Sequence, residues 1–127
     1  MLEPVVRLGV LERAVMNCLW TADRAMTVRE VYEALRSGRQ IAYTTVLTTL
    51  QRMARKGLLH QSRDERAHRY SAAATRQEMF AELLADALGV ADGDPGAFVR
   101  FVDELGSEER MALREALDGE AKDEREP

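Results

Sequence analysis

The 127-residue sequence is poor in cysteine, proline and long apolar runs. Its single cysteine, Cys18, excludes a disulfide within the chain and is typical of proteins from a reducing compartment. With three prolines, 46% hydrophobic and 31% charged residues, the composition indicates a helix-rich folded protein and not a disordered one. No apolar run approaches the roughly 18 residues of a membrane-spanning helix, and the N-terminus, which carries Glu3, is not that of a signal peptide. We therefore expect a cytoplasmic protein without membrane insertion.

The sequence motifs of common catalytic and cofactor sites are also missing. There is no glycine-rich phosphate loop, no His-Glu-x-x-His and no Gly-x-Ser-x-Gly. His60, His68 and the distant Cys18 do not make a zinc set. We therefore expect no enzymatic activity, no cofactor and no metal. Cys18 lies among apolar residues, where a small buried hydrophobe is the expected role and a redox sensor is the alternative.

The positive charge of the chain is concentrated in its first half. Residues 1–70 contain 12 lysines and arginines against 7 acidic residues, a net charge of +5, whereas residues 71–127 contain 6 against 15, a net charge of −9. A basic half attracts a polyanion and an acidic half repels it. Nucleic-acid binding is therefore expected only in the first seventy residues.

The segment from Tyr43 to Gly57 has the pattern of an amphipathic helix with a basic polar face. At a helical repeat of about 100° per residue, Val46, Leu50 and Met53 fall on one side, and the opposite side has no acidic residue. Short hydroxyls at the start of a helix and arginines at its end suit the DNA major groove, where the first turns meet base edges and long cations reach phosphates. The candidate DNA-binding residues of this helix are Thr44, Thr45, Thr48, Gln51, Arg52 and Arg55. For Thr45, a role in capping the helix is the alternative.

The elements around this helix are expected in the order of a winged helix-turn-helix. The pattern predicts helices over residues 10–20, 28–36 and 43–56, a short strand at 25–26, and strands over 58–62 and 68–71. The last two strands form a β-hairpin wing, whose tip holds Arg63 and Arg66 as further DNA-binding candidates. These arginines flank Asp64 and Glu65, so pairing within the tip is the alternative.

Three more helices are expected after Thr75, which opens the first of them as a capping-box residue. That helix is predicted to end at about Leu88, before a loop over residues 89–94 that contains two glycines. A segment of about 45 residues rarely makes an adequate core alone, so we expect these helices to pack against a second copy of the chain. The predicted homodimer interface consists of Phe80, Leu83, Leu84, Leu88, Phe98, Phe101, Val102, Leu105, Met111, Leu113 and Leu117.

These patterns predict a mainly α protein with three parts. A winged-helix DNA-binding domain is expected over residues 1–73, and a helical dimerisation domain over residues 74–119. An acidic tail is expected over residues 120–127.

Five short motifs lie along the predicted helices and strands. They are Leu8-x-x-Leu-Glu-x-x-Val-Met-x-x-Leu-Trp20, Val28-Arg-Glu-Val-Tyr32, Tyr43-Thr-Thr-Val46, Arg55-Lys-Gly-Leu-Leu59 and His68-Arg-Tyr70. Together they resemble the BlaI/MecI family of penicillinase repressors, most of all its mycobacterial members, over about residues 8–118. The resemblance implies a winged-helix domain, a three-helix dimerisation domain and repression from inverted repeats of TACA/TGTA-like half-sites. The genes under control would be those of β-lactam resistance and related operons.

The resemblance also implies a way of releasing the repressor from DNA. In staphylococcal members, a membrane sensor of β-lactams triggers cleavage of an Asn-Phe bond in the dimerisation segment, and the matching bond here is Arg100-Phe101. A regulatory protease or membrane β-lactam sensor is therefore an expected partner, beside the double-stranded DNA operator. Three alternatives stay open: a winged-helix module that binds only proteins, a dimer that binds DNA without sequence preference, and a helical structural dimer whose basic face is incidental.

Overall fold

The structure, a computed structural model, describes residues 8–125 of the chain, and the side chains of residues 8–120. Residues 1–7, where no signal peptide is predicted, lie outside the described residues. So do the last two residues of the predicted acidic tail. The chain divides into two compact units, Met1–Leu84 and Ala85–Pro127. Within the described part, no helix is long and apolar enough to cross a membrane.

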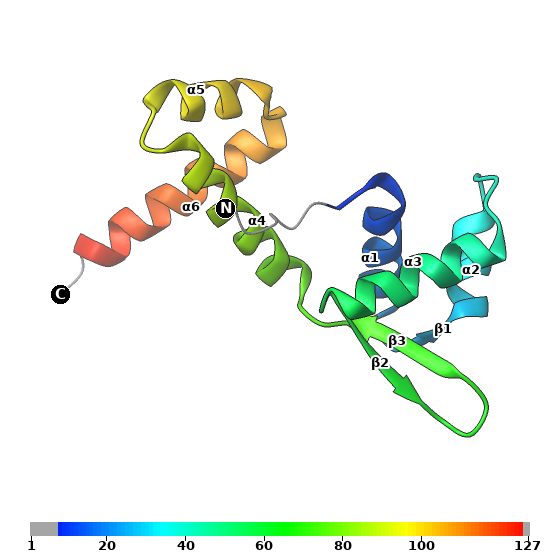
Figure 1. Cartoon of the computed structure of the whole chain (residues 1–127). Coiled ribbons are helices and arrows are strands. Elements are labelled where there is room, and N and C mark those ends of the chain that lie inside the picture. The colour runs from blue at the N-terminus through cyan, green and yellow to red at the C-terminus, as the bar shows by residue number, and fades with distance from the viewer. Residues whose placement is uncertain (1–7, 126–127) are drawn as a thin grey trace. The chain divides into compact units, whose positions relative to one another are not determined.

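The first unit has the order of a winged helix-turn-helix (Figure 1). Its described elements are α1 (Val10–Ala22), β1 (Met26–Thr27), α2 (Val28–Arg36), α3 (Tyr43–Arg55), β2 (Leu59–Arg63), β3 (His68–Ala72) and the start of α4 (Arg76–Ala91). Strand β3 lies between β1 and β2 and pairs antiparallel with both. Figure 1 shows the helices gathered on one side of this sheet, while the β2–β3 hairpin extends away from them as the wing. The predicted winged-helix fold is therefore confirmed.

Capping residues mark the starts of α2 and α4, whereas α1 continues beyond its predicted end at residue 20, to Ala22. At α2, the Thr27 hydroxyl accepts a hydrogen bond from the Glu30 amide at 3.1 Å, and the Glu30 carboxylate accepts one from the Thr27 amide at 3.0 Å. The same reciprocal pair forms between Thr75 and Glu78 at the start of α4. Such capping boxes satisfy backbone amides that have no acceptor within the helix. Gly57, with φ of +83°, provides the left-handed turn after α3.

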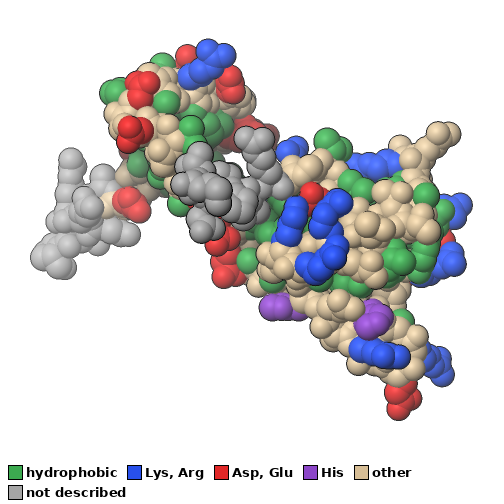
Figure 2. Space-filling view, in the orientation of Figure 1, with side chains coloured by type: hydrophobic (Ala, Val, Ile, Leu, Met, Phe, Trp, Pro, Cys, Tyr) green, Lys and Arg blue, Asp and Glu red, His purple; other side chains and the backbone are tan. Residues whose placement is uncertain are grey.

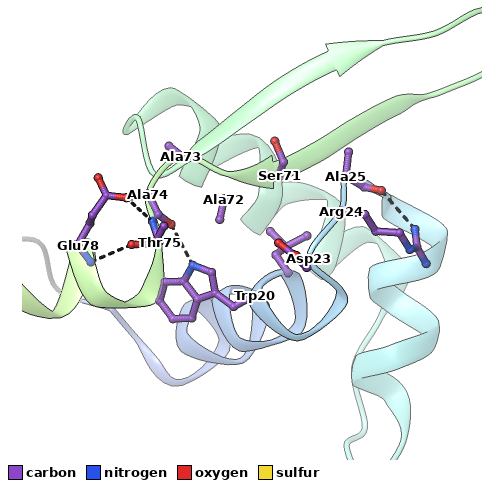
Figure 3. Close-up of a pocket in the computed structure, with 11 residues that line it drawn as sticks. Trp20, Asp23, Arg24, Ala25, Ser71, Ala72, Ala73, Ala74, Thr75 and Glu78 are labelled. Atoms are coloured by element: carbon purple, nitrogen blue, oxygen red, sulfur yellow. Dashed lines mark hydrogen bonds between the residues drawn. The ribbon is translucent and has the colours of Figure 1, made fainter.

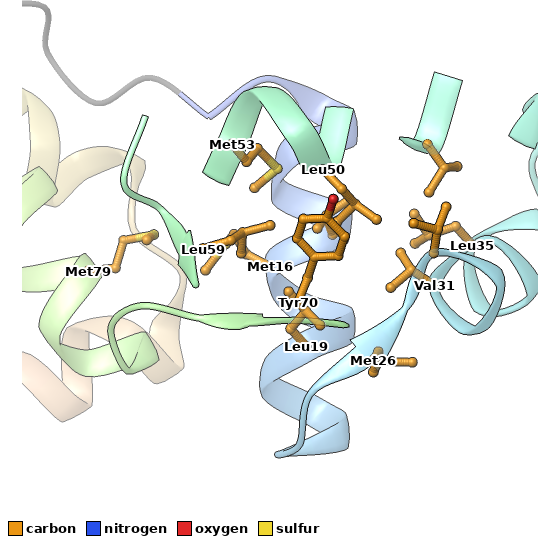
Figure 4. Close-up of a cluster of buried hydrophobic side chains, with 13 residues drawn as sticks. Met16, Leu19, Met26, Val31, Leu35, Leu50, Met53, Leu59, Tyr70 and Met79 are labelled. Atoms are coloured by element: carbon orange, nitrogen blue, oxygen red, sulfur yellow. The ribbon is translucent and has the colours of Figure 1, made fainter. Parts of the chain in front are cut away.

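The hydrophobic core joins α1, α2 and α3 to the sheet. Its buried residues are Val15, Met16, Leu19, Met26, Val28, Val31, Leu35, Val46, Leu50, Met53, Leu59, Tyr70 and Met79. The predicted apolar face of α3 is confirmed, since Val46, Leu50 and Met53 are 0% exposed. Tyr70, which is 1% exposed, reaches from β3 toward Leu50 (Figure 4). The apolar side of α3 therefore packs against the core, and its polar side is exposed to solvent.

One buried polar residue of α3 was not predicted. Thr49 is 2% exposed, and its hydroxyl donates a 2.8 Å hydrogen bond to the carbonyl oxygen of Thr45, one turn earlier. A buried hydroxyl is tolerated when it has such a partner. Thr49 therefore belongs to the packed side of α3, whereas Thr45 and Thr48 are exposed.

The first turns of α4 are anchored on the first unit. The Trp20 indole donates a 3.0 Å hydrogen bond to the Ala74 carbonyl, at a cleft of about 320 Å³ between the ends of α1 and β3 and the start of α4 (Figure 3). The Arg76 guanidinium lies 4.7 Å from the centre of the Trp20 ring. Met79 is buried in the core and Leu83, expected at the dimer interface, packs partly against it. The winged-helix unit thus continues past residue 73.

The second unit contains the remainder of α4, followed by α5 (Pro95–Glu104) and α6 (Ser107–Arg125). Asp94 caps α5 by accepting a 2.9 Å hydrogen bond from the Gly96 amide. The predicted helix end at Leu88 and loop from residue 89 are wrong, because α4 continues to Ala91. The left-handed residues that end it are Asp92 and Gly93, with φ of 49° and 75°.

Helix α6 is also longer than the sequence pattern indicated. It runs through Gly119 to Arg125, into the stretch where an acidic tail was predicted. The stretch Glu-Ala-Lys-Asp-Glu-Arg consists mostly of strong helix formers. A high charge therefore did not prevent helix formation here.

The apolar side chains of α4, α5 and α6 that are predicted at the dimer interface stay largely uncovered. No residue of α5 is buried, and Leu84 and Leu105 are half-buried. The expected interface residues that are exposed are Phe80, Leu88, Phe98, Phe101, Val102, Met111, Leu113 and Leu117. This many exposed large apolar side chains on three helices are typical of an interaction site.

Candidate nucleic-acid interface

The polar side of α3 is exposed along its whole length. Ala42 is the N-cap and makes no side-chain capping bond, so the alternative in which Thr45 caps the helix is wrong. The first turn has no acidic residue, and Arg52 and Arg55 lie in the last turn. The six side chains predicted to contact DNA from this helix are all exposed. The helix therefore presents hydroxyls near its N-terminus and cations near its C-terminus.

A shallow groove of about 350 Å³ runs beside the first turns of α3. Four of the predicted residues line it: Thr44, Thr45, Thr48 and Arg52. Two further lining residues, Leu11 of α1 and Thr49, were not predicted. Gln51 and Arg55 lie on the same helix but outside this groove. Figure 2 shows, on the face in view, basic side chains spread over the first unit and near the end of the wing.

The wing tip is organised by Asp64. One carboxylate oxygen of Asp64 accepts hydrogen bonds from the amides of Arg66 and Ala67 at 2.9 and 3.0 Å, and the other accepts from Arg69 Nε at 2.6 Å. The guanidinium of Arg69, followed by the two amides, lowers the pKa of Asp64 to about 2. Within residues 8–120, no ion pair involves Arg63 or Arg66. The predicted alternative, in which these two arginines pair inside the tip, is therefore wrong.

A line of alternating charges continues from Arg69 toward α2. Arg69 Nη1 lies 3.4 Å from one carboxylate oxygen of Glu30, whose other oxygen lies 2.8 Å from Arg24 Nη1. The Thr27 amide and the Arg24 side chain lower the pKa of Glu30. The sequence patterns did not predict this line of charges. Its members come from separate elements, and only the β1–β3 register, with Thr27 opposite Arg69, brings them together.

Aromatic and basic side chains also meet between α2 and the start of α3. The Arg29 guanidinium lies 5.3 Å from the centre of the Tyr43 ring, which meets Tyr32 edge to face at 5.5 Å. Arg36 lies 5.7 Å from the Tyr32 ring. Sequence reasoning also missed these residues, although Arg29, Tyr32 and Arg36 recur at helical spacing on α2. They add cationic surface beside the N-terminus of α3.

Cys18 is half-buried and packs against the core, with its Sγ 3.8 Å from Met26 Sδ. Burial raises the pKa of the Cys18 thiol, which disfavours the reactive thiolate. In the described part of the chain, no cluster of three or more His, Cys, Asp or Glu side chains could hold a metal ion.

Comparison with known proteins agrees with the winged-helix fold and the exposed polar side of α3. Residues 8–119 match the penicillinase repressor family. The transcriptional regulator BlaI of Mycobacterium tuberculosis (strain CDC 1551 / Oshkosh) is 51% identical over 117 residues, which cover 89% of this chain and 84% of that protein. The protein of the same name from strain ATCC 25618 / H37Rv matches equally.

Among solved structures, RosR of H. salinarum is similar, with a TM-score of 0.52 and 19% identity over 93% of this chain and 99% of that one. The complex structure of hsRosR-S4 has a TM-score of 0.53 and 19% identity, covering 92% and 94%. At this identity the likeness shows the fold alone. The match to a family of transcriptional repressors confirms that the chain is a regulator and not an enzyme. With its winged helix and a family match over residues 8–119, the chain belongs to the penicillinase repressor family of DNA-binding transcriptional repressors.

Proposed function

We propose that the protein represses transcription as a homodimer on inverted-repeat operators with TACA/TGTA-like half-sites. The observation that carries the proposal is the exposed polar side of α3, which has hydroxyls first, cations last and no acidic residue. A helix of this kind enters the major groove with its N-terminal turns at the base edges. The genes controlled are those of β-lactam resistance and related operons, and the protein acts in the cytoplasm, where the DNA is.

The exposed side chains divide by chemistry into base readers and phosphate ligands. The hydroxyls of Thr44, Thr45 and Thr48 bond base edges or phosphates, and their methyl groups contact thymine methyls. Gln51 offers a bidentate contact to adenine. The cations that bind phosphates are Arg52 and Arg55 of α3 and Arg63 and Arg66 of the wing tip.

The second unit supplies the contact between the two copies. Its uncovered apolar side chains need a partner surface, and a second copy of the same unit offers an apolar face of the same kind. One winged-helix module binds DNA in the non-specific range, with a Kd of about 10⁻⁴–10⁻⁶ M at physiological salt. Linking two modules makes the second contact intramolecular and gains about 10²–10⁴ in affinity. Dimerisation thus converts weak modules into a repressor.

Loss of the second unit would therefore release the DNA. We propose Arg100-Phe101 as the bond that a regulatory protease, activated by a membrane sensor of β-lactams, cleaves. The Arg100 side chain is 85% exposed and pairs with Glu104 at 3.7 Å, one turn further along α5. Because the bond lies inside a helix, cleavage requires local unwinding of α5, which few buried contacts oppose.

Fluorescence anisotropy of labelled duplexes tests the operator assignment. We expect the full chain to prefer a TACA/TGTA inverted repeat over a scrambled duplex of equal length by about a thousandfold or more. Equal binding to both duplexes, with strong salt dependence, would leave a DNA-binding dimer without sequence preference. No binding to either would favour a helical structural dimer with an incidental basic face, or a winged helix that binds only proteins.

Two substitutions on α3 should separate phosphate binding from base reading. Arg52→Gln is expected to weaken binding to both duplexes and to reduce the slope of log K against log salt by about 0.9, the value of one phosphate contact on B-DNA. Thr48→Val removes a hydroxyl but keeps the shape, so it should weaken only the repeat, by about three- to tenfold. Salt titrations of both variants measure this. An unchanged slope for Arg52→Gln would remove Arg52 from the phosphate contacts.

A further inference from the structure

We propose that Asp64 and Arg69 are positioning residues that hold the wing tip in its DNA-binding form, so that an acidic residue strengthens binding to a polyanion. The inference rests on the proposed function, since it concerns the wing that contacts phosphates. It assigns a role to one acidic residue of the tip and to the β3 arginine that binds it, neither of which is among the proposed DNA ligands.

The first observation is the way in which Asp64 closes the tip. Its side chain accepts the amides of Arg66 and Ala67, and its own amide donates to the Ala67 carbonyl at 3.1 Å. The second carboxylate oxygen binds Arg69 Nε on the returning strand β3 at 2.6 Å. One carboxylate therefore ties the turn over residues 64–67 to the strand that follows it.

The second observation is that the Arg69 guanidinium binds two different carboxylates. Nε binds Asp64, while Nη1 binds Glu30 at 3.4 Å. Glu30 caps α2 and also pairs with Arg24. The tip is thereby connected to the start of α2, which packs against α3 through the core. Arg69 thus joins the position of the wing to that of the DNA-reading helix.

The third observation is that these bonds leave two arginines of the wing tip available to bind phosphates. Arg63 and Arg66 are exposed, and within residues 8–120 neither makes an ion pair. Exposed ion pairs such as Asp64–Arg69 add little to global stability. Their effect is instead to order the tip before DNA arrives, which removes part of the ordering cost from the binding step. The Asp64 carboxylate, with its pKa of about 2, is ionised throughout the neutral range.

The test is a substitution for which charge and geometry predict opposite results. Asp64→Asn removes a negative charge near the phosphates, so electrostatics alone predict tighter binding. We expect weaker binding to the inverted-repeat duplex, by about three- to tenfold, because the single oxygen of the amide cannot accept from both the turn amides and Arg69, so that the tip loses order. Glu65→Gln is the matched control. It makes the same charge change at the next residue, which has no hydrogen bond or ion pair among the described side chains, and it should bind as tightly as the native chain or more tightly.

A second pair of variants examines Arg69 itself. Arg69→Lys keeps the charge, but one ammonium cannot reproduce the two-sided contact to Asp64 and Glu30. We expect it to weaken binding nearly as much as Arg69→Gln, and Asp64→Asn combined with Arg69→Gln to weaken binding no further than either alone. Native affinity in Arg69→Lys, or tighter binding in Asp64→Asn, would overturn the proposal.

The order of the wing is also measurable without DNA. Backbone ¹⁵N relaxation of the free full chain should show larger fast motion at residues 64–67 in Asp64→Asn than in Glu65→Gln, with both variants folded in thermal unfolding. If the native chain binds no duplex, the proposed function fails, whereas this difference in order still tests the positioning role. Equal order in the two variants would contradict it.

Discussion

Cutting the chain after Leu84 is expected to lower its affinity for an inverted-repeat operator by about 10²–10⁴-fold, the gain that linking two modules provides. Electrostatics alone predict the opposite result, a higher affinity for DNA. Residues 85–127 hold 5 lysines and arginines against 13 acidic residues, a net charge of −8, so their removal makes the fragment more attractive to DNA. A loss of affinity would therefore report the loss of the dimer.

The end point of the fragment follows from the core. Met79 is buried among the winged-helix residues and Leu83 packs against them, so a cut at residue 73 would damage the DNA-binding unit itself. Full-length Phe98→Asp is the matched control, because it keeps every other residue and places a charge on a side chain that is 43% exposed. It should lose affinity as the fragment does and sediment as a monomer. Native operator affinity in the fragment would rule out dimerisation through the second unit.

The second large effect is expected from Leu50→Ala, which should lower the free energy of unfolding by about 2–5 kcal/mol. Leu50 is 0% exposed and lies on the packed side of α3 against Tyr70. The shortened side chain leaves a cavity between the helix and the sheet, which the surrounding core cannot fully close. Urea or thermal unfolding of the purified chain measures the change.

Gln51→Ala is the control for this substitution, since Gln51 is the next residue on the same helix and is exposed. Its free energy of unfolding should stay within about 0.5 kcal/mol of the native value, while its operator affinity falls. The two variants thus separate the supporting side of α3 from the reading side. A loss below about 1 kcal/mol in Leu50→Ala would mean that the core closes around the shorter side chain.

Periodicity predicted the first unit well because its helices are amphipathic. Val46, Leu50 and Met53 repeat at helical spacing, and this is sufficient to assign their side of α3 to the core. It did not reveal that Thr49 is buried, because a hydroxyl satisfied by the carbonyl of Thr45 depends on packing and not on polarity. The end of α4 was misplaced because Gly89 looks like a terminator, whereas the backbone turns at Asp92 and Gly93.

In the candidate DNA-binding site too, some features could be predicted from the sequence and others could not. Side chains on one helix, such as Thr48 and Arg52, can be grouped from spacing alone, and the structure leaves both exposed beside one groove. The contact of Asp64 with Arg69 depends on the hairpin register, and that of Arg29 with Tyr43 on the packing of two helices. Neither is visible in local sequence, because strand register and helix packing are decided by tertiary structure.

The most direct measurement is the number of protomers on one operator duplex. Analytical ultracentrifugation of the full chain with a labelled TACA/TGTA inverted repeat, and with a duplex in which one half-site is scrambled, gives this number. We expect two protomers on the intact repeat at protein concentrations where the half-site duplex stays largely free. One protomer per repeat, or equal occupancy of the two duplexes, would contradict a dimer that places one α3 helix in each half-site.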